Sequence, residues 1–222
     1  MLKEELTNQI LFGSNGYTPT VKPIEMEEGE FMIAVGKPTY FCVGIVDIVG
    51  STKIVSRLSP SKSAKYYEIF LNNMTKVVHQ YKGQILKTMG DSLLFYFPET
   101  SNSERKFGFL GALECGFEMM GIHEKLKILL AEEMLPQIDF RISFDYGNVT
   151  MMRNAKGDID LVGPTINTCA KINGLCPVNG MIIGGDLHEK TKTFKEYNFK
   201  NHASFTIDMK HPYPVFTICR KQ

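Results

Sequence analysis

The sequence lacks the features that mark several large classes of protein. No apolar stretch in the 222 residues approaches the roughly 20 residues of a membrane-spanning helix. The five cysteines are odd in number and none is spaced as CxxC. A disulfide framework or zinc site is therefore not expected, and a reducing, cytoplasmic location fits. The opening MLKEELTNQILFG is charged early and has no uninterrupted apolar core, unlike a secretory signal.

An excess of one charge is also missing. Lys and Arg number 25 against 24 Asp and Glu, so no basic field for nucleic acid or an anionic membrane is expected. The phosphate-binding pattern GxxxxGK[ST] is absent too. What remains, with 43% hydrophobic and 22% charged residues, is an ordinary globular composition with ample material for a core.

The chain changes character near residue 38. Residues 1–37 hold the turn-rich GSNGYTPTVKP and the acidic EMEEGE, and we interpret them as an N-terminal extension. Residues 38–222 carry regular apolar patterns and are predicted to form the main domain. Its helices alternate with hairpins in the order βα-ββ-α-ββ, which predicts an α+β fold with a mostly antiparallel central sheet and packed helices.

Apolar spacing places the individual elements. Tyr40–Asp47 is nearly all apolar and predicts a central strand covered on both faces. A helix is predicted from Ser51 onward, with Gly83 placed to end it, and a second over Glu104–Glu132. Two segments are each predicted to form a strand, a turn and a second strand: QILKTMGDSLLFYF and QIDFRISFDYGNVTMMRN. The remaining predictions are a helix in GPTINTCAKINGLC, a strand in GMIIGG, a short helix in DLHEKTKTF and a hairpin in FTIDMKHPYPVFTICRK.

Two carboxylates stand at the ends of apolar strands. Asp47 closes the first strand, and Asp91 lies in the turn of the next hairpin. If the strands are neighbours, the two acids share one sheet edge and raise each other's pKa unless a cation lies between them. Oxygen ligands of this kind suit Mg²⁺ or Mn²⁺, which also bind substrate phosphates.

The loop after Asp47 adds a phosphate-accepting turn. Gly50 admits close backbone approach, and the N–H groups of Ser51 and Thr52 open a helix, where phosphate is attracted. Carboxylates and turn together describe a nucleoside-triphosphate site. A strand end with a capping Ser and a plain Gly-Asp turn would explain each segment alone, and the two together favour the site.

Three ordered segments carry a family resemblance. In these segments the sequence resembles the class III nucleotidyl cyclases, and the match runs from roughly Tyr40 to Cys219. The segments are VDIVGST, LKTMGDSLLFYF and DIDLVGPTINTCAKI. The resemblance implies the ferredoxin-like cyclase domain fold. It also implies that Asp47 and Asp91 bind two Mg²⁺ or Mn²⁺ ions, with the Ile48 carbonyl as a further ligand.

The resemblance also assigns the substrate contacts. Lys87 matches the lysine that reads the purine, and Asp160 matches the acceptor for the adenine amino group. Guanylyl cyclases typically carry Glu and Cys or similar there, so the pair favours ATP over GTP. Asp158 is a rival for the role of Asp160. Lys210 falls near a family lysine that contacts the terminal phosphates.

The resemblance also implies roles in the reaction for two positions in the third segment. Asn167 matches the residue that orients the ribose. Four residues later the family usually has Arg, and here the position is Lys171. Lysine keeps the charge but lacks the planar fork of arginine, which would cost about 1–3 kcal/mol unless a neighbour such as Arg153 compensates.

The implied reaction is attack of the ribose 3′-hydroxyl on the α-phosphorus, which releases pyrophosphate and forms cyclic AMP. The family forms its site between two subunits, with metal ligands from one chain and Lys87, Asp160 and Asn167 from the other. This chain carries both sets, which implies a homodimer with two sites. Two alternatives stay open. The first is a cyclase that acts on GTP or on a pyrimidine triphosphate, and Lys87 and Asp160 argue against it. The second is a non-catalytic nucleotide-binding domain, which Lys171 favours.

Overall fold

A single sheet organises the part of the chain that the computed structural model describes, residues 33–154, 159–206 and 212–221. Its strands are β1 (Ile33–Ile48), β2 (Gln84–Met89), β3 (Ser92–Phe97), β4 (Phe140–Asn154), β5 (Ile159–Val162), β6 (Met181–Gly184), β7 (Tyr197–Thr206) and β8 (Pro212–Arg220). They run in the order β2-β3-β1-β4-β6-β8-β7, with β5 paired to β4 outside this path. The pairing of β4 with β6 is parallel and the others are antiparallel.

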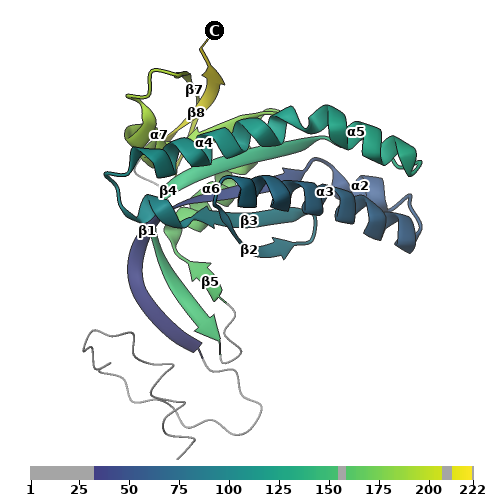
Figure 1. The fold of residues 1–222 in the computed structure, drawn as a ribbon, viewed down its shortest axis with the longest axis horizontal. Helices are drawn as coiled ribbons and strands as arrows, with labels where there is room; N and C mark the ends of the chain where they lie inside the picture. The colour runs from purple at the N-terminus through teal and green to yellow at the C-terminus, as the bar shows by residue number, and fades with distance from the viewer. Residues whose placement is uncertain (1–32, 155–158, 207–211, 222) are drawn as a thin grey trace, which may run out of the picture.

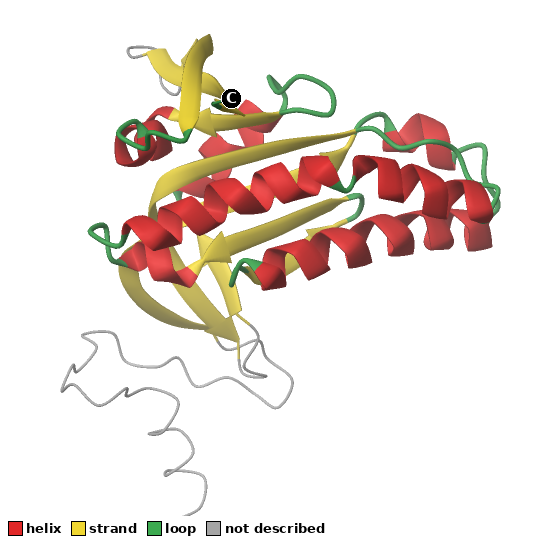
Figure 2. Ribbon diagram, turned by 45° about the horizontal axis from the view of Figure 1, so that its top comes forward, coloured by secondary structure: helices red, strands yellow, loops and turns green. Residues whose placement is uncertain are grey.

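Helices cover both faces of this sheet. They are α2 (Ser51–Val55), α3 (Pro60–Gln80), α4 (Lys106–Gly121), α5 (His123–Glu132), α6 (Pro164–Asn173) and α7 (Gly185–Thr191), with a 3₁₀ turn η1 (Pro98–Ser101). Figure 1 shows α3, α4 and α5 crossing one face, and Figure 2 shows the same layers turned by 45°. The predicted α+β fold with a mostly antiparallel sheet is confirmed. None of the helices in the described ranges is long and apolar enough to cross a bilayer.

Side-chain alternation along β1 divides the core in two. Cys42 and Val46 face a large cluster that contains buried residues of α3, α4 and α5, whereas Val43 and Ile45 face a smaller cluster that includes Cys169 of α6. Because successive strand residues point to opposite faces, Asp47 continues the series of Val43 and Ile45. Its carboxylate therefore lies on the face that α6 covers.

Both long helical predictions are broken in the structure. Between α2 and α3, Ser59 caps the second helix by accepting from the N–H of Lys62, and Pro60 takes its first position. α4 and α5 meet at Ile122, which ends one helix and begins the other.

The predicted stop at Gly83 is also displaced. The helix ends at Gln80, and Lys82, with φ of 60°, adopts the left-handed conformation that follows it. The N–H of Gly83 closes the turn on the carbonyl of Val78. The absence of a side chain at Gly83 serves packing, because a Cβ there would lie 2.6 Å from Cγ1 of Val78.

The second predicted hairpin is wrong. QIDFRISFDYGNVTMMRN forms one strand, β4, with no turn at Asp145–Asn148. Asp145 is buried and accepts hydrogen bonds from the Tyr213 hydroxyl at 2.8 and 3.0 Å. A Cβ on Gly147 would lie 2.5 Å from Oγ1 of Thr165. Tertiary contacts explain these turn-forming residue types, so they do not mark a chain reversal here.

The sheet also extends beyond the predicted strands. β1 begins at Ile33, within the predicted extension, and pairs with β4 along its length apart from an irregularity between Val35 and Pro38. The short strand β5 was not predicted. The division at residue 38 stays a prediction, because residues 1–32 lie outside the described ranges.

Candidate active site at the edge of β1

The two predicted carboxylates meet. Asp47 pairs across β1 and β3 with Ser92, and Asp91 is the residue before Ser92, in the turn that Gly90 opens with φ of 69°. Burial first, and then the charge of Asp91, raise the pKa of Asp47 to about 6, while the opposite charge of Arg141 lowers it. The two acids therefore lie close enough to repel each other, at the end of β1 and in the turn before β3.

The hydroxyl of Ser51 holds the second acid. Ser51 is the first residue of α2, is 7% exposed, and donates a short hydrogen bond to Oδ2 of Asp91. Its side chain is turned to the carboxylate. Gly50, with φ of 68°, and Thr52 are exposed, and no atom lies within 4 Å of where a Cβ on Gly50 would stand. The turn is thus open to a ligand at Gly50 and Thr52.

The donor set fits a hard divalent ion that is coordinated by both the protein and a substrate. The described residues contain no cluster of three or more His, Cys, Asp and Glu side chains that could hold a metal. Two carboxylates and a main-chain carbonyl such as that of Ile48 leave coordination positions for phosphate and water. Mg²⁺ binds in this manner beside phosphates.

The two residues predicted to read the base also meet. Nζ of Lys87, on β2, lies 2.6 Å from Oδ2 of Asp160, on β5, and the two side chains are 43% and 39% exposed. The other carboxylate oxygen accepts from the N–H of Leu161 at 2.9 Å. Each side chain holds the other in place and both remain accessible to a ligand.

The hairpin connects these two groups of residues. Counting back from the Gly90-Asp91 turn, regular pairing places Lys87 opposite Leu94, on the same face as Asp47. A β-bulge at Leu86 follows, so that Ile85 returns to the face covered by α3, α4 and α5. One hairpin thus carries a metal-ligand candidate at its turn and a base-reading candidate on its strand.

The third predicted group lies on α6. Asn167 and Lys171 lie one turn apart on α6, and both are exposed. No hydrogen bond or ion pair between described residues joins either of them to Asp47 or Asp91. Lys210 and Asp158 lie outside the described ranges. Arg153 is exposed near the end of β4, opposite Ile159.

Sequence reasoning missed Arg141. It pairs with Asp47 across β1 and β4, and its charge is the one that lowers the pKa of Asp47. Its Nε is buried without a hydrogen-bond partner among the described residues. The only signal in the sequence was a basic residue inside an apolar strand, and the strand register that gives it meaning was not predictable.

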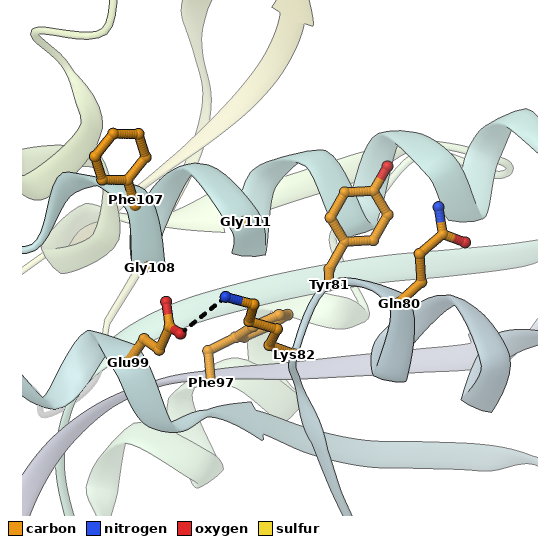
Figure 3. Close-up of a pocket in the computed structure, with 8 residues that line it drawn as sticks. All are labelled: Gln80, Tyr81, Lys82, Phe97, Glu99, Phe107, Gly108 and Gly111. Carbon is orange, nitrogen blue, oxygen red and sulfur yellow. Dashed lines mark hydrogen bonds and ion pairs between the residues drawn. The ribbon is translucent and has the colours of Figure 1, made fainter.

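A pocket of about 200 Å³ lies elsewhere. Figure 3 shows it between the end of α3, η1 and the start of α4, where Lys82 contacts Glu99 at 3.4 Å. Its lining residues are Gln80, Tyr81, Lys82, Phe97, Glu99, Phe107, Gly108 and Gly111. None of these is a predicted site residue. The candidate site of Asp47 and Asp91 lies instead at the end of β1 and in the turn before β3.

Known proteins with similar sequences are nucleotidyl cyclases. A cytidylate cyclase of Staphylococcus aureus is 24% identical over 91% of this chain and 53% of its own length. A cytidylate cyclase of Escherichia coli is 22% identical over 68% of the chain and 35% of its own. An adenylate cyclase of Streptomyces coelicolor is 21% identical over 64% and 31%. This chain therefore spans about half or less of these relatives.

Solved structures show the same fold. An adenylyl cyclase from P. aeruginosa superposes with a TM-score of 0.74 at 16% identity, covering 85% of this chain and 97% of that one. A guanylyl cyclase superposes with a TM-score of 0.72 at 20% identity, covering 83% and 94%. The family model of the adenylate and guanylate cyclase catalytic domain matches residues 35–219, and the chain belongs to that class III cyclase family.

Proposed function

We propose that the protein converts a nucleoside triphosphate to its 3′,5′-cyclic monophosphate and pyrophosphate. The observation that carries the proposal is the repelling pair of Asp47 and Asp91 on a sheet edge, beside an exposed turn at Gly50 and Thr52. These two carboxylates and the Ile48 carbonyl would hold two Mg²⁺ or Mn²⁺ ions. The bound ions would acidify the 3′-hydroxyl and neutralise the triphosphate.

The chain's own residues supply the remaining contacts. The main chain of Gly50 and Thr52 would bind phosphate oxygens, and Arg141, opposite Asp47, adds a cation at the same edge. Asn167 would orient the ribose. Lys171 would stabilise charge that develops on the α-phosphate as the bond to pyrophosphate breaks, and Lys210 would bind the terminal phosphates.

The base is proposed to be one whose pairing edge carries an amino group where guanine and uracil carry a carbonyl. Asp160 accepts hydrogen bonds, and Lys87 donates them. Adenine presents an amino group beside an unprotonated ring nitrogen, which this pair complements. Guanine presents a carbonyl beside a protonated nitrogen, which reverses the pattern. The Lys87–Asp160 contact at 2.6 Å therefore supports ATP over GTP.

CTP is the second candidate. Cytosine carries the same amino group and unprotonated nitrogen on its pairing edge as adenine does, whereas uracil resembles guanine. The pair of Lys87 and Asp160 thus does not separate ATP from CTP, and our sequence argument against pyrimidines holds only for UTP. Similarity to two cytidylate cyclases at 24% and 22% identity supports CTP.

We further propose a homodimer with two equivalent sites. Asn167 and Lys171 are exposed on α6, and no hydrogen bond or ion pair among the described residues joins them to the carboxylates, which supports an arrangement in which a second copy supplies them. The non-catalytic alternative rests on Lys171 in place of arginine, and the retained pairs Asp47 with Asp91 and Lys87 with Asp160 count against it.

Product analysis tests the proposal. The protein is incubated with ATP, CTP, GTP or UTP at high Mn²⁺, and products are identified by mass spectrometry. We expect a cyclic nucleotide from ATP, CTP or both, with little from GTP or UTP. Absence of product from all four, together with tight nucleotide binding, would instead favour the non-catalytic domain. A preference for GTP would overturn the role of Lys87 and Asp160.

A further inference from the structure

The last residue of α6, Asn173, carries a buried amide to which the proposed reaction gives no role. The residue is 6% exposed. Its Nδ2 donates toward three oxygen atoms of the sheet: the Ile45 carbonyl of β1 at 3.4 Å, the Arg141 carbonyl of β4 at 3.5 Å and Oγ of Ser143 on β4 at 3.2 Å. One side chain of the helix thus contacts both central strands.

Two further hydrogen bonds join the same helix to β4. Ser143 is fully buried and donates from Oγ to the Cys169 carbonyl at 3.0 Å. Thr165, near the start of α6, donates to the Asn148 carbonyl at 3.0 Å. Apolar contacts are non-directional, whereas hydrogen bonds require a defined geometry. A buried polar network of this kind therefore fixes where α6 stands along the strands and how it is rotated.

The exposed side of α6 carries the two residues proposed to contact the ribose and the α-phosphate. Asn167 and Lys171 lie there, and Asn173 follows Lys171 by two residues with its side chain turned to the sheet. A shift of the end of the helix would move Lys171 with it. A misplacement of about 1 Å at a reacting group costs about 100-fold in rate.

The strands under the amide are held independently of it. Ile45 lies two residues before Asp47, and Arg141 is the partner of Asp47 across β1 and β4. β1 pairs with β3 on one side of Asp47 and with β4 on the other. The bonds described above, in contrast, all join α6 to these strands through side chains. Loss of the amide is therefore expected to displace the helix and to leave Asp47 in place.

We propose that Asn173 is a positioning residue, which sets the place of Asn167 and Lys171 by tying the end of α6 to β1 and β4. This inference rests on the proposed function, because it takes those two exposed residues to act in the reaction. The amide acts through the helix and does not itself contact the substrate. Its removal should lower turnover without weakening metal binding.

Turnover and metal affinity distinguish this role from a general contribution to stability. Mn²⁺ is titrated with 3′-deoxy-ATP, or with 3′-deoxy-CTP if only CTP is cyclised, and free Mn²⁺ is followed by electron paramagnetic resonance. We expect Asn173→Ala to lower kcat at least tenfold and to leave Mn²⁺ affinity unchanged. The matched control is Thr191→Val on α7, which removes a buried hydrogen bond from the Thr191 hydroxyl to the Leu187 carbonyl at 2.9 Å. It should change neither quantity.

Hydrogen exchange measures the placement of α6 without relying on activity. Amides of residues 164–173 should exchange faster in Asn173→Ala than in the parent and should be unchanged in Thr191→Val. Ser143→Ala removes only the hydroxyl between the amide and Cys169, so it should show both effects in smaller measure. It also replaces Asn173→Ala in every measurement if that variant does not fold.

Three results would overturn the inference: a kcat equal to that of Thr191→Val, a loss of Mn²⁺ affinity that accounts for the fall in turnover, or unchanged exchange in α6. The proposed function fails separately. A parent that yields no cyclic nucleotide contradicts that function, whereas faster exchange confined to α6 in the variant would still support the anchoring of the helix by Asn173.

Discussion

At the residue scale, the raised pKa of Asp47 implies a cost to stability. Its pKa of about 6 reflects a carboxylate that is partly buried beside another acid. In metal-free buffer at pH 8, Asp47→Asn removes this repulsion. Because the side chain is only half-buried, we expect the free energy of unfolding to rise by about 1 kcal/mol rather than by the full equivalent of the shift. Cyclisation should fall below about one-hundredth of the parent rate.

Urea unfolding and a product assay measure the two effects. Glu104→Gln, which removes an exposed carboxylate away from the site, is the control and should change neither. If Asp47→Asn keeps the parent's activity, the metal assignment is wrong. If it lowers stability, the carboxylate is held by favourable contacts and the repulsion argument fails.

Asp145 is a second acid with a displaced pKa, and this pKa makes the stability of the fold depend on pH. Burial raises the pKa of Asp145 to about 7, although hydrogen bonds from Tyr213 and the N–H of Tyr146 oppose the shift. The folded state therefore binds a proton that the unfolded state releases above pH 4. Stability from this group is fully present below pH 4 and is lost as pH rises toward 7.

The variant Asp145→Asn removes this titration. We expect its stability to be lower overall, since amide hydrogens replace an acceptor, but to depend less on pH between 4 and 7. The slope should differ from the parent's by at most about 1.4 kcal/mol per pH unit, the value for one proton. Chemical denaturation at several pH values gives both slopes. Parallel curves for parent and variant would show that Asp145 is ionised throughout.

At the scale of elements, two glycines of helix α4 have different surroundings. A Cβ on Gly111 would stand 3.7 Å from the Tyr81 carbonyl, an ordinary contact. Gly111→Ala should therefore stabilise the protein by about 0.5–1 kcal/mol through the helix propensity of alanine. A Cβ on Gly116 would collide with Sδ of Met181 and stand 2.7 Å from the Phe144 ring. Gly116→Ala should cost about 1–3 kcal/mol.

Thermal and urea unfolding of the two variants check this pair. Each substitution adds one methyl group to the same helix, so propensity alone predicts the same gain for both. Opposite signs would confirm that α4 is held against β4 and β6 by the bare backbone at Gly116. A gain at both positions would contradict the packing described there.

The elements also show how much of the fold and of the candidate site can be predicted from the sequence. Asp47 and Asp91 were predictable as a pair because strand alternation and the Gly-Asp turn are local signals. The break before Pro60 had its signal in Ser59 and Pro60, but apolar spacing continued across it. β4 was misread as a hairpin because Asp145 and Gly147 are set by contacts with Tyr213 and Thr165, far away in sequence. Arg141 gained its meaning only from the register of β1 and β4.

At the scale of the whole molecule, the exposure of two residues of α6 bears on the proposed assembly. Asn167 and Lys171 are exposed on it, and no hydrogen bond or ion pair among the described residues joins them to Asp47 or Asp91 of the same chain. A site shared by two copies would need only that the exposed surfaces meet, which gives two equivalent sites by symmetry.

Mixing two inactive variants distinguishes these cases. Asp47→Asn damages the metal side of the proposed site, and Asn167→Ala damages the ribose side. A dimer of one copy of each has one site with both defects and one with none. After subunit exchange, half of the dimers are mixed, so we expect recovery of about a quarter of the parent activity. The control pairs Asp47→Asn with Asp91→Asn, where every site keeps a damaged metal side and activity should not return. Recovery in neither mixture, under conditions where mass spectrometry shows that subunits have exchanged, would mean that each site is built from a single chain.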